Sequence, residues 1–415
     1  MAKDWGQIGG IAGVVGAIAA VAALGLAVKQ DFFGTFAKTQ NDDGKGCNGF
    51  LIKENPVILS KKAIPDAVET DNLQKKIFSC RDELQKNDKN AVAYTNIGEA
   101  TRRLGDLPVA LIAQQEAVKL DPNLQEARIG LGLVQFFMGQ AAEANKTLQV
   151  ALAQKESPII YFYLGVSFGQ QKDWKSAEAS FRRSIDLDSN YTDAHYNLGV
   201  TLGKQGKTAD AISAYQKAVS LNPDFAEAYT NLGVVLYEQD NLEEAISAFQ
   251  KAIGLDPNLV EAYSNLGGAL AKQGKTADAI SAFQKAISLN PNYAEVYFNL
   301  GTTFLYTQGK TADAISAFRK AISLNPKYAE AYGNLGTALY EQENLEEAIS
   351  AFQKAILLNP NDANAHRNWG VILGSQGNEM GAISKLKKAR DLYRAQGETQ
   401  EANKITQFLE RVGTR

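Results

Sequence analysis

Asparagine recurs at a fixed period along the chain, and its side-chain amide can both donate and accept hydrogen bonds. Five asparagines begin an Asn-Leu-Gly tripeptide, at spacings of 34, 34, 34 and 35 residues. A row of amides at such a spacing can hold the backbone of an extended peptide without reading its side chains. With the equivalent residues on either side, the predicted peptide-binding residues are Asn96, Asn197, Asn231, Asn265, Asn299, Asn334 and Asn368.

The asparagines belong to a sequence repeat, which must fold into the elements that position them. The frame set by the tripeptides extends to nine repeats over residues 91–396, and the repeat that begins at Ala294 has one extra residue near Tyr306. Within one repeat, residues 229–236 and 245–253 each carry apolar side chains at helical spacing. Each repeat is therefore predicted to form two helices, and the fold class is all-α.

Small residues recur at two positions of the repeat. Alanine fills the twentieth position throughout, from Ala110 to Ala382. Glycine in a helix costs about 1 kcal/mol relative to alanine, so its recurrence predicts a close backbone approach at that position. The eighth position is glycine in all nine repeats, at Gly98, Gly132, Gly165, Gly199, Gly233, Gly267, Gly301, Gly336 and Gly370.

The repeat resembles the tetratricopeptide repeat (TPR). One repeat fills the family's signature positions with Tyr229, Leu232, Gly233, Ala245, Phe249, Ala252 and Pro257. The resemblance covers roughly three quarters of the chain. It implies a solenoid of helical hairpins, a right-handed superhelix whose first helices line a concave groove that binds protein segments. Residues 397–415 would then form the closing helix that a solenoid needs.

The asparagine row is similar to the ladder in the substrate-recruiting TPR region of O-linked N-acetylglucosamine transferases. No part of the chain has the alternating strands and helices of their catalytic domain, so the resemblance does not carry the activity over. Asparagine is also common at this position throughout the family, where it packs between helices. Both interpretations of the row stay open.

Two further sets of groove positions have distinctive chemistry. Four aromatic side chains predict an apolar patch, which would bind a hydrophobic partner segment or be covered by residues 29–90: Phe136, Phe137, Phe162 and Tyr163. The second position of five successive repeats is acidic, at Asp193, Glu227, Glu261, Glu295 and Glu330. These acids argue against a cationic clamp for peptide carboxylates. They would favour basic peptides or complement the helix dipole.

Little in the sequence suggests catalysis. The two histidines, His195 and His366, replace tyrosines of other repeats and are predicted to be core-edge aromatics. Three Gly-Lys-Thr tripeptides, starting at Gly206, Gly274 and Gly309, lack the glycine that a phosphate-binding loop needs five residues earlier. We interpret them as glycine ending one helix and threonine capping the next. No enzyme activity, cofactor or metal is expected.

The N-terminal region differs in composition from the repeats. Residues 8–28 are an uncharged run of 21 residues, long enough as a helix to cross the hydrocarbon core of a membrane. Residues 1–28 are therefore predicted to be a tail and membrane anchor. An alternative is a signal peptide cleaved near residues 20–22.

The flanks of residues 8–28 bear on topology and association. More lysines follow this run than precede it, which favours cytoplasmic repeats; signal cleavage would make the protein secreted or periplasmic. Gly9, Gly13 and Ala17 share one helix face, so a dimer mediated by the anchor is possible.

Residues 29–90 are predicted to be a linker with a capping helix at about residues 70–86. They contain both cysteines, Cys47 and Cys80. A disulfide between them needs an oxidising compartment, and we favour two free thiols instead.

The charge balance excludes a basic nucleic-acid binder. Lysine and arginine number 43 against 46 aspartate and glutamate, giving a net charge of −3. The sequence as a whole predicts a membrane-anchored scaffold that binds protein or peptide segments in a TPR groove. Alternatives are a secreted or periplasmic scaffold, an assembly factor for a membrane complex, and a substrate-recruiting subunit of a protein-modifying enzyme.

Overall fold

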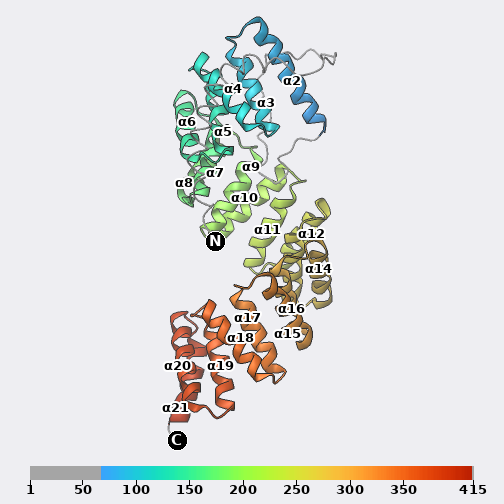
Figure 1. Ribbon diagram of the computed structural model, residues 1–415, viewed down its shortest axis with the longest axis vertical. Coiled ribbons are helices and arrows are strands. Elements are labelled where there is room, and N and C mark those ends of the chain that lie inside the picture. Colours follow the sequence, from blue (N-terminus) through green and yellow to red (C-terminus); the bar gives the residue numbers. More distant parts are fainter. Residues whose placement is uncertain (1–66, 414–415) are drawn as a thin grey trace, which may run out of the picture. The chain divides into compact units, whose positions relative to one another are not determined.

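The computed structural model describes residues 67–413, and within them the chain is entirely helical, with twenty helices and no strand (Figure 1). It divides into two compact bodies between Tyr191 and Thr192. The N-terminal body contains α2 (Ala67–Lys86), α3 (Ala91–Arg103), α4 (Leu107–Leu120), α5 (Gln125–Phe137), α6 (Ala141–Gln154), α7 (Pro158–Gln170) and α8 (Trp174–Leu187).

The C-terminal body contains six repeats and a last single helix. Its first four repeats are α9 (Thr192–Lys204) with α10 (Thr208–Leu221), α11 (Ala226–Glu238) with α12 (Leu242–Leu255), α13 (Val260–Lys272) with α14 (Thr276–Leu289), and α15 (Ala294–Gln308) with α16 (Thr311–Leu324). The remainder are α17 (Ala329–Glu341) with α18 (Leu345–Leu358), α19 (Ala363–Ser375) with α20 (Glu379–Ala395), and α21 (Thr399–Gly413).

Every predicted repeat in residues 91–396 contains one helical hairpin. Within each body the two helices of a hairpin pack together, and the second helix also packs on the first helix of the next repeat. A helix precedes the first repeat as α2, and another follows the last as α21. The predicted pairing of helices therefore holds, and within each body the hairpins stack as in a solenoid.

Six of the nine recurring glycines are sites of close approach by a ring, and the other three meet Gln114, Leu148 and Leu386. A Cβ built on Gly267 would lie 2.6 Å from Cε1 of Phe283 on the second helix, and Gly233 meets Phe249 in the same way. Phe283 is buried at 1% exposure. The sequence predicted a close backbone approach, and the structure shows an aromatic edge against the helix backbone instead. The ring fills the space that a methyl group would occupy.

The three Gly-Lys-Thr tripeptides connect helices, as predicted. Gly206, Gly274 and Gly309 have φ of 72°, 85° and 60°, which glycine adopts without strain. The capping residue of the following helix is the lysine, however, and the threonine is its first helical residue. The predicted threonine cap was therefore wrong by one position.

The inserted residue near Tyr306 lengthens a helix. The first helix of this repeat, α15, has 15 residues, whereas α13 and α17 have 13. The extra length leaves the Tyr306 side chain 60% exposed.

Within residues 67–413, no helix has the combined length and hydropathy that crossing a membrane requires. The predicted anchor at residues 8–28 lies outside the described residues, as does most of the predicted linker.

Cys80 contradicts our preference for two free thiols. Its side chain is fully buried beside Leu84 and Ile97, and it is disulfide-bonded. Cys47, the only other cysteine in the sequence, lies outside the described residues.

The ring contact predicts opposite effects at two adjacent glycines of α13. Gly267→Ala should lower the stability of the C-terminal body by about 1 to 2 kcal/mol, because overpacking against Phe283 exceeds the gain in helix propensity. Gly268→Ala, where a Cβ would meet open space, should raise stability by about 0.5 to 1 kcal/mol. Urea unfolding followed by circular dichroism measures both. Equal effects at the two positions would contradict the ring contact.

Candidate peptide-binding face

The first helices of the C-terminal body form a continuous face that carries six of the seven predicted asparagines. Each first helix from α9 to α19 contacts the next one. The asparagines stand at the same position of each helix, so they follow one another along this face. All six are partly exposed: Asn197, Asn231, Asn265, Asn299, Asn334 and Asn368.

Three of the six link neighbouring first helices. Asn231 Nδ2 donates to Tyr196 Oη at 3.0 Å, and Asn334 Nδ2 donates to Thr302 Oγ1 at 3.4 Å. Asn368 Nδ2 donates to Thr337 Oγ1 at 3.2 Å and its oxygen accepts from Arg367 Nε at 3.2 Å. These contacts match the packing interpretation of the row.

The other three asparagines do not bridge helices. Asn197 Nδ2 donates to the carbonyl of Asp193, one turn earlier in its own helix, at 2.8 Å. Within residues 67–413, the side-chain amides of Asn265 and Asn299 make no hydrogen bond. Their donors and acceptors are therefore available to a ligand.

Asn96 differs from the row in position and in exposure. It lies on α3 in the N-terminal body, and its side chain is 1% exposed. The neighbouring side chains of Thr95 and Glu99 are also buried, at 0% and 2% exposed. Its burial sets it apart from the accessible amides.

The four aromatic groove residues form a closed cluster rather than an open patch. Phe162 and Tyr163 are fully buried, Phe136 is 8% exposed and Phe137 is partly buried. Edge-to-face contacts join Tyr163 to each of the other three, with ring centroids 5.1 to 6.2 Å apart. The burial of these rings removes them from the surface available to a partner.

A buried ion network that sequence reasoning missed lies beside these rings. Glu99 accepts hydrogen bonds from Arg102 and Arg103 at 2.7 to 2.9 Å, and the Arg102 guanidinium lies 4.9 Å from the Phe137 ring centroid. Burial alone would raise the pKa of the Glu99 carboxyl, but the two guanidinium groups outweigh it and lower that pKa. The helical spacing of Glu99 and Arg102 was the only available sequence signal.

The two histidines are buried, as a core-edge role requires: His195 is 9% exposed and His366 is 6% exposed. Burial and the nearby Lys385 lower the pKa of His366, which favours its neutral form.

Within the described part of the chain, no group of three His, Cys, Asp or Glu side chains could hold a metal ion.

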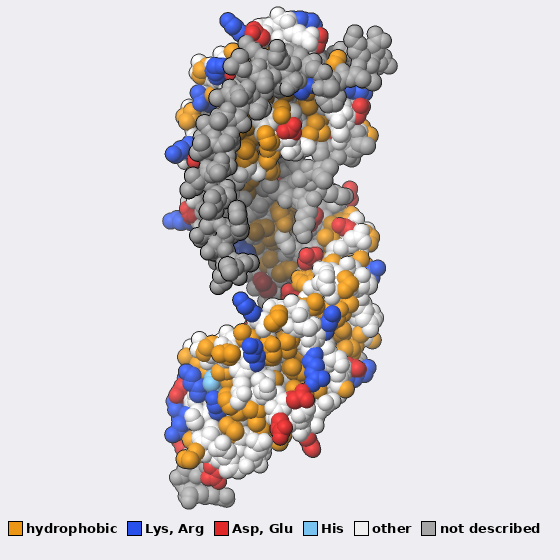
Figure 2. Space-filling view, in the orientation of Figure 1, with side chains coloured by type: hydrophobic (Ala, Val, Ile, Leu, Met, Phe, Trp, Pro, Cys, Tyr) orange, Lys and Arg blue, Asp and Glu red, His pale blue; other side chains and the backbone are white. Residues whose placement is uncertain are grey.

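Carboxylates precede the asparagines of successive first helices by four residues, or about one helical turn. Glu261, Glu295 and Glu330 are exposed, and within residues 67–413 no ion pair engages them. Burial, together with Glu295 and its neighbouring glutamates, raises the pKa of Tyr293 and of Tyr328 to about 12. On the side of the molecule that Figure 2 shows, acidic, basic and apolar side chains are interspersed over the described residues.

The repeats match models of a known protein family. Two models described as tetratricopeptide repeat match the chain, one at residues 129–192, 196–260, 303–366 and 334–396 and the other at residues 258–327. The chain belongs to the tetratricopeptide repeat family. By that membership it is a protein–protein interaction scaffold. No curated protein matches the chain.

Solved TPR structures resemble parts of the chain. MamA is 30% identical, covering 42% of this chain and 94% of its own, with a TM-score of 0.38. A TPR protein from Parabacteroides merdae is 19% identical, covering 61% of this chain and 100% of its own, with a TM-score of 0.51. The pilF protein of Pseudomonas aeruginosa is 23% identical, covering 50% of this chain and 94% of its own, with a TM-score of 0.45. The Parabacteroides match supports the TPR fold and nothing finer.

The buried carboxyl of Asp193, at the second position of its repeat, predicts that the stability of the fold depends on pH. Burial raises the pKa of its carboxyl to about 6, above the value of about 3.9 in an unfolded chain. The folded state therefore binds more protons than the unfolded state between these values, and stability falls as pH rises through them. Asp193→Asn should raise stability at pH 7.5 by about 2 kcal/mol and have little effect at pH 4.

Thermal unfolding of both proteins at the two pH values measures the difference. Glu295→Gln, which alters an exposed acid at the same repeat position, is the matched control and should change little. Equal stability of Asp193→Asn and the parent protein at pH 7.5 would contradict the burial of this charge.

Proposed function

We propose that the protein is a scaffold that holds an extended segment of a partner protein along the first-helix face of its C-terminal body. The observation that carries this proposal is the pair of amides at Asn265 and Asn299. They stand in the middle of the row, are partly exposed and have no hydrogen-bond partner within residues 67–413. Packing interactions account for Asn231, Asn334 and Asn368 but leave this pair unexplained.

The chemistry of a carboxamide suits a peptide backbone. Each Asn side chain offers two N–H donors and two acceptor lone pairs, which match the carbonyl and N–H of an extended chain. The asparagines that already donate one hydrogen bond keep their remaining capacity. Such contacts are tolerant of partner sequence, so a family of related segments is expected rather than a single motif.

The carboxylates beside the row add a charge preference. Glu261, Glu295 and Glu330 are exposed acids in successive repeats and have no cationic partner among the described residues. Their summed potential favours a segment that carries lysine or arginine. Binding should therefore weaken as salt concentration rises.

A double substitution tests the amide pair. Asn265→Ala with Asn299→Ala should weaken capture of partners from native extract, by about thirtyfold or more in affinity. The loss of two or more hydrogen bonds at roughly 1 kcal/mol each sets this scale. Quantitative mass spectrometry of proteins captured by the full chain at graded concentrations measures it.

The matched control removes two asparagines from exposed interhelical turns, as Asn258→Ala with Asn292→Ala. It should keep every partner of the parent protein. Retention of all partners by the Asn265/Asn299 variant, with unchanged helicity, would reject the amide row as the binding site.

The proposal also gives the scaffold a location. The length and apolar character of residues 8–28 support a membrane anchor. The disulfide at Cys80 supports an oxidising compartment for the repeats, in place of the cytoplasmic side that the lysine distribution favoured. Anchored and signal-cleaved forms share this compartment.

Thiol labelling tests the compartment. In protein extracted from its native source into denaturant that contains a maleimide reagent, neither cysteine should be labelled unless the sample is reduced first. Mass spectrometry of the intact chain counts the labels. Two labels before reduction would place the repeats in a reducing compartment and contradict this location.

A further inference from the structure

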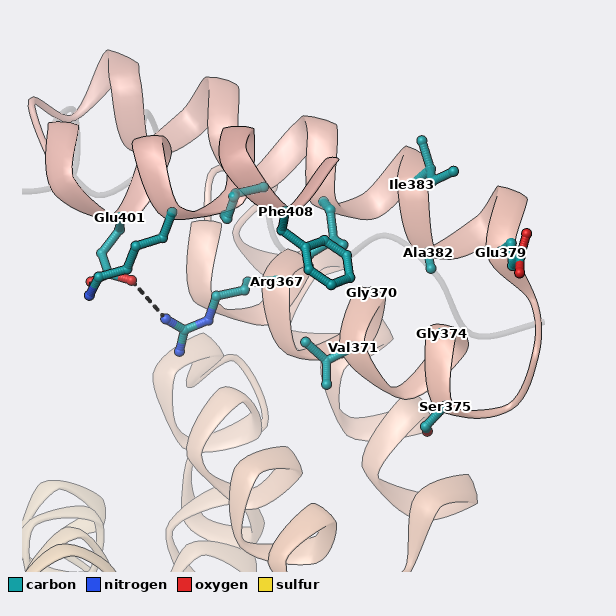
Figure 3. Close-up of a pocket in the computed structure, with 13 residues that line it drawn as sticks. Arg367, Gly370, Val371, Gly374, Ser375, Glu379, Ala382, Ile383, Glu401 and Phe408 are labelled. Atoms are coloured by element: carbon teal, nitrogen blue, oxygen red, sulfur yellow. Dashed lines mark hydrogen bonds and ion pairs between the residues drawn. The ribbon is translucent and has the colours of Figure 1, made fainter. Parts of the chain in front are cut away.

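An apolar hollow lies at the C-terminal end of the C-terminal body, between α19, α20 and α21. Its volume is about 550 Å³. Val371 and Phe408 stand at its rim, and Ile383, Leu386 and Ile405 form apolar walls (Figure 3). The hollow adjoins the C-terminal end of the first-helix face, because its lining residue Arg367 lies on α19 and donates to Asn368 of the asparagine row.

One residue that lines the hollow is smaller than its equivalent in the preceding repeat. Tyr340 lies in the last turn of α17 and is 38% exposed. The equivalent position of α19 is Gly374. A Cβ on Gly374 would lie 3.6 Å from Cβ of Ala382, an ordinary contact, so the site accepts a methyl group without a clash. Ser375 replaces Glu341 at the next position and is also small. A ring-sized space is left open.

Apolar side chains at the rim are exposed where a solenoid needs a polar cap. Phe408 is 52% exposed and Val371 is 44% exposed. Met380, on the first turn of α20 next to the lining residue Glu379, is 86% exposed. Exposed apolar side chains at the rim of a hollow are a feature of interaction sites. Phe408 stands beside the hollow of its own chain without filling it.

The charges around the hollow are arranged with opposite signs at its two ends. Figure 3 shows Glu379 at one end and the Arg367–Glu401 pair at the other, with Phe408 between them. Lys404 belongs to the second end, where Glu401 pairs with both cations. Within the described residues Glu379 has no ion pair, so one end is acidic and the other has an excess of positive charge.

We propose that the hollow is the interface of a homodimer, in which Phe408 of each chain fills the hollow of the other. A twofold axis reverses the direction of the second copy, so each Glu379 meets the partner's cationic end and each ring meets a ring-sized space. The surface is complementary to itself in shape and charge. This dimer does not involve residues 8–28, and its interface borders the peptide-binding face at α19, whereas Asn265 and Asn299 lie on α13 and α15.

Three substitutions in the full chain test the interface by sedimentation equilibrium in one non-ionic detergent. Phe408→Ala should raise the dimer dissociation constant at least tenfold. Gly374→Tyr introduces the side chain that the preceding repeat has at this position, so it should fill the hollow and raise the melting temperature. It should also raise the dimer dissociation constant at least tenfold, as Phe408→Ala does. Leu357→Ala, at another exposed apolar side chain, should leave the dimer unchanged.

Charge reversal provides a rescue. Glu379→Lys alone and Lys404→Glu alone should each raise the dissociation constant severalfold, and the double variant should recover much of the loss. A parent protein that is monomeric throughout the micromolar range would overturn the proposal. So would a dimer unaffected by Phe408→Ala and Gly374→Tyr, since residues outside the hollow would then hold it together.

Discussion

The contact between an aromatic ring and a glycine, found inside five of the six hairpins, is the constraint on which the C-terminal body depends. The second helix presents its ring to the glycine of the first, as Phe283 does to Gly267 and Phe352 does to Gly336. The rings are buried almost completely, so each contributes a large apolar surface to the core. Glycine is unfavourable in a helix, and here it is retained because any side chain would displace the ring.

This packing decides which side chains are left for function. Because the hairpin buries its ring and its small alanines inside, the opposite side of each first helix remains open. Asn265 and Asn299 occupy that side and keep their hydrogen-bonding capacity. At the end of the array, α19, α20 and α21 surround the hollow beside Phe408, and Gly374 lines it where the preceding repeat has Tyr340.

Local sequence was enough to predict the hairpins because the repeat period and the glycine and alanine positions are properties of each repeat alone. It was not enough to separate the asparagines by role. Asn231 bonds to Tyr196 and Asn334 bonds to Thr302, so the role of each amide depends on which residue the neighbouring helix presents. The burial of Asn96 and the disulfide at Cys80 also depend on tertiary contacts between distant segments. The hollow was missed because a small residue in one repeat is informative only when the surrounding walls are known.

The most direct test of the binding face is photo-crosslinking from Gly268, which follows Asn265 by three residues on α13 and where a new side chain meets open space. A photoreactive residue there should capture partner protein in native extract, whereas one at Ser281, exposed on the second helix α14, should capture little. Strong crosslinking from Gly268 alone is the result that the account predicts. Equal crosslinking from both positions, or crosslinking from Ser281 alone, would show that partners do not bind along the first-helix face.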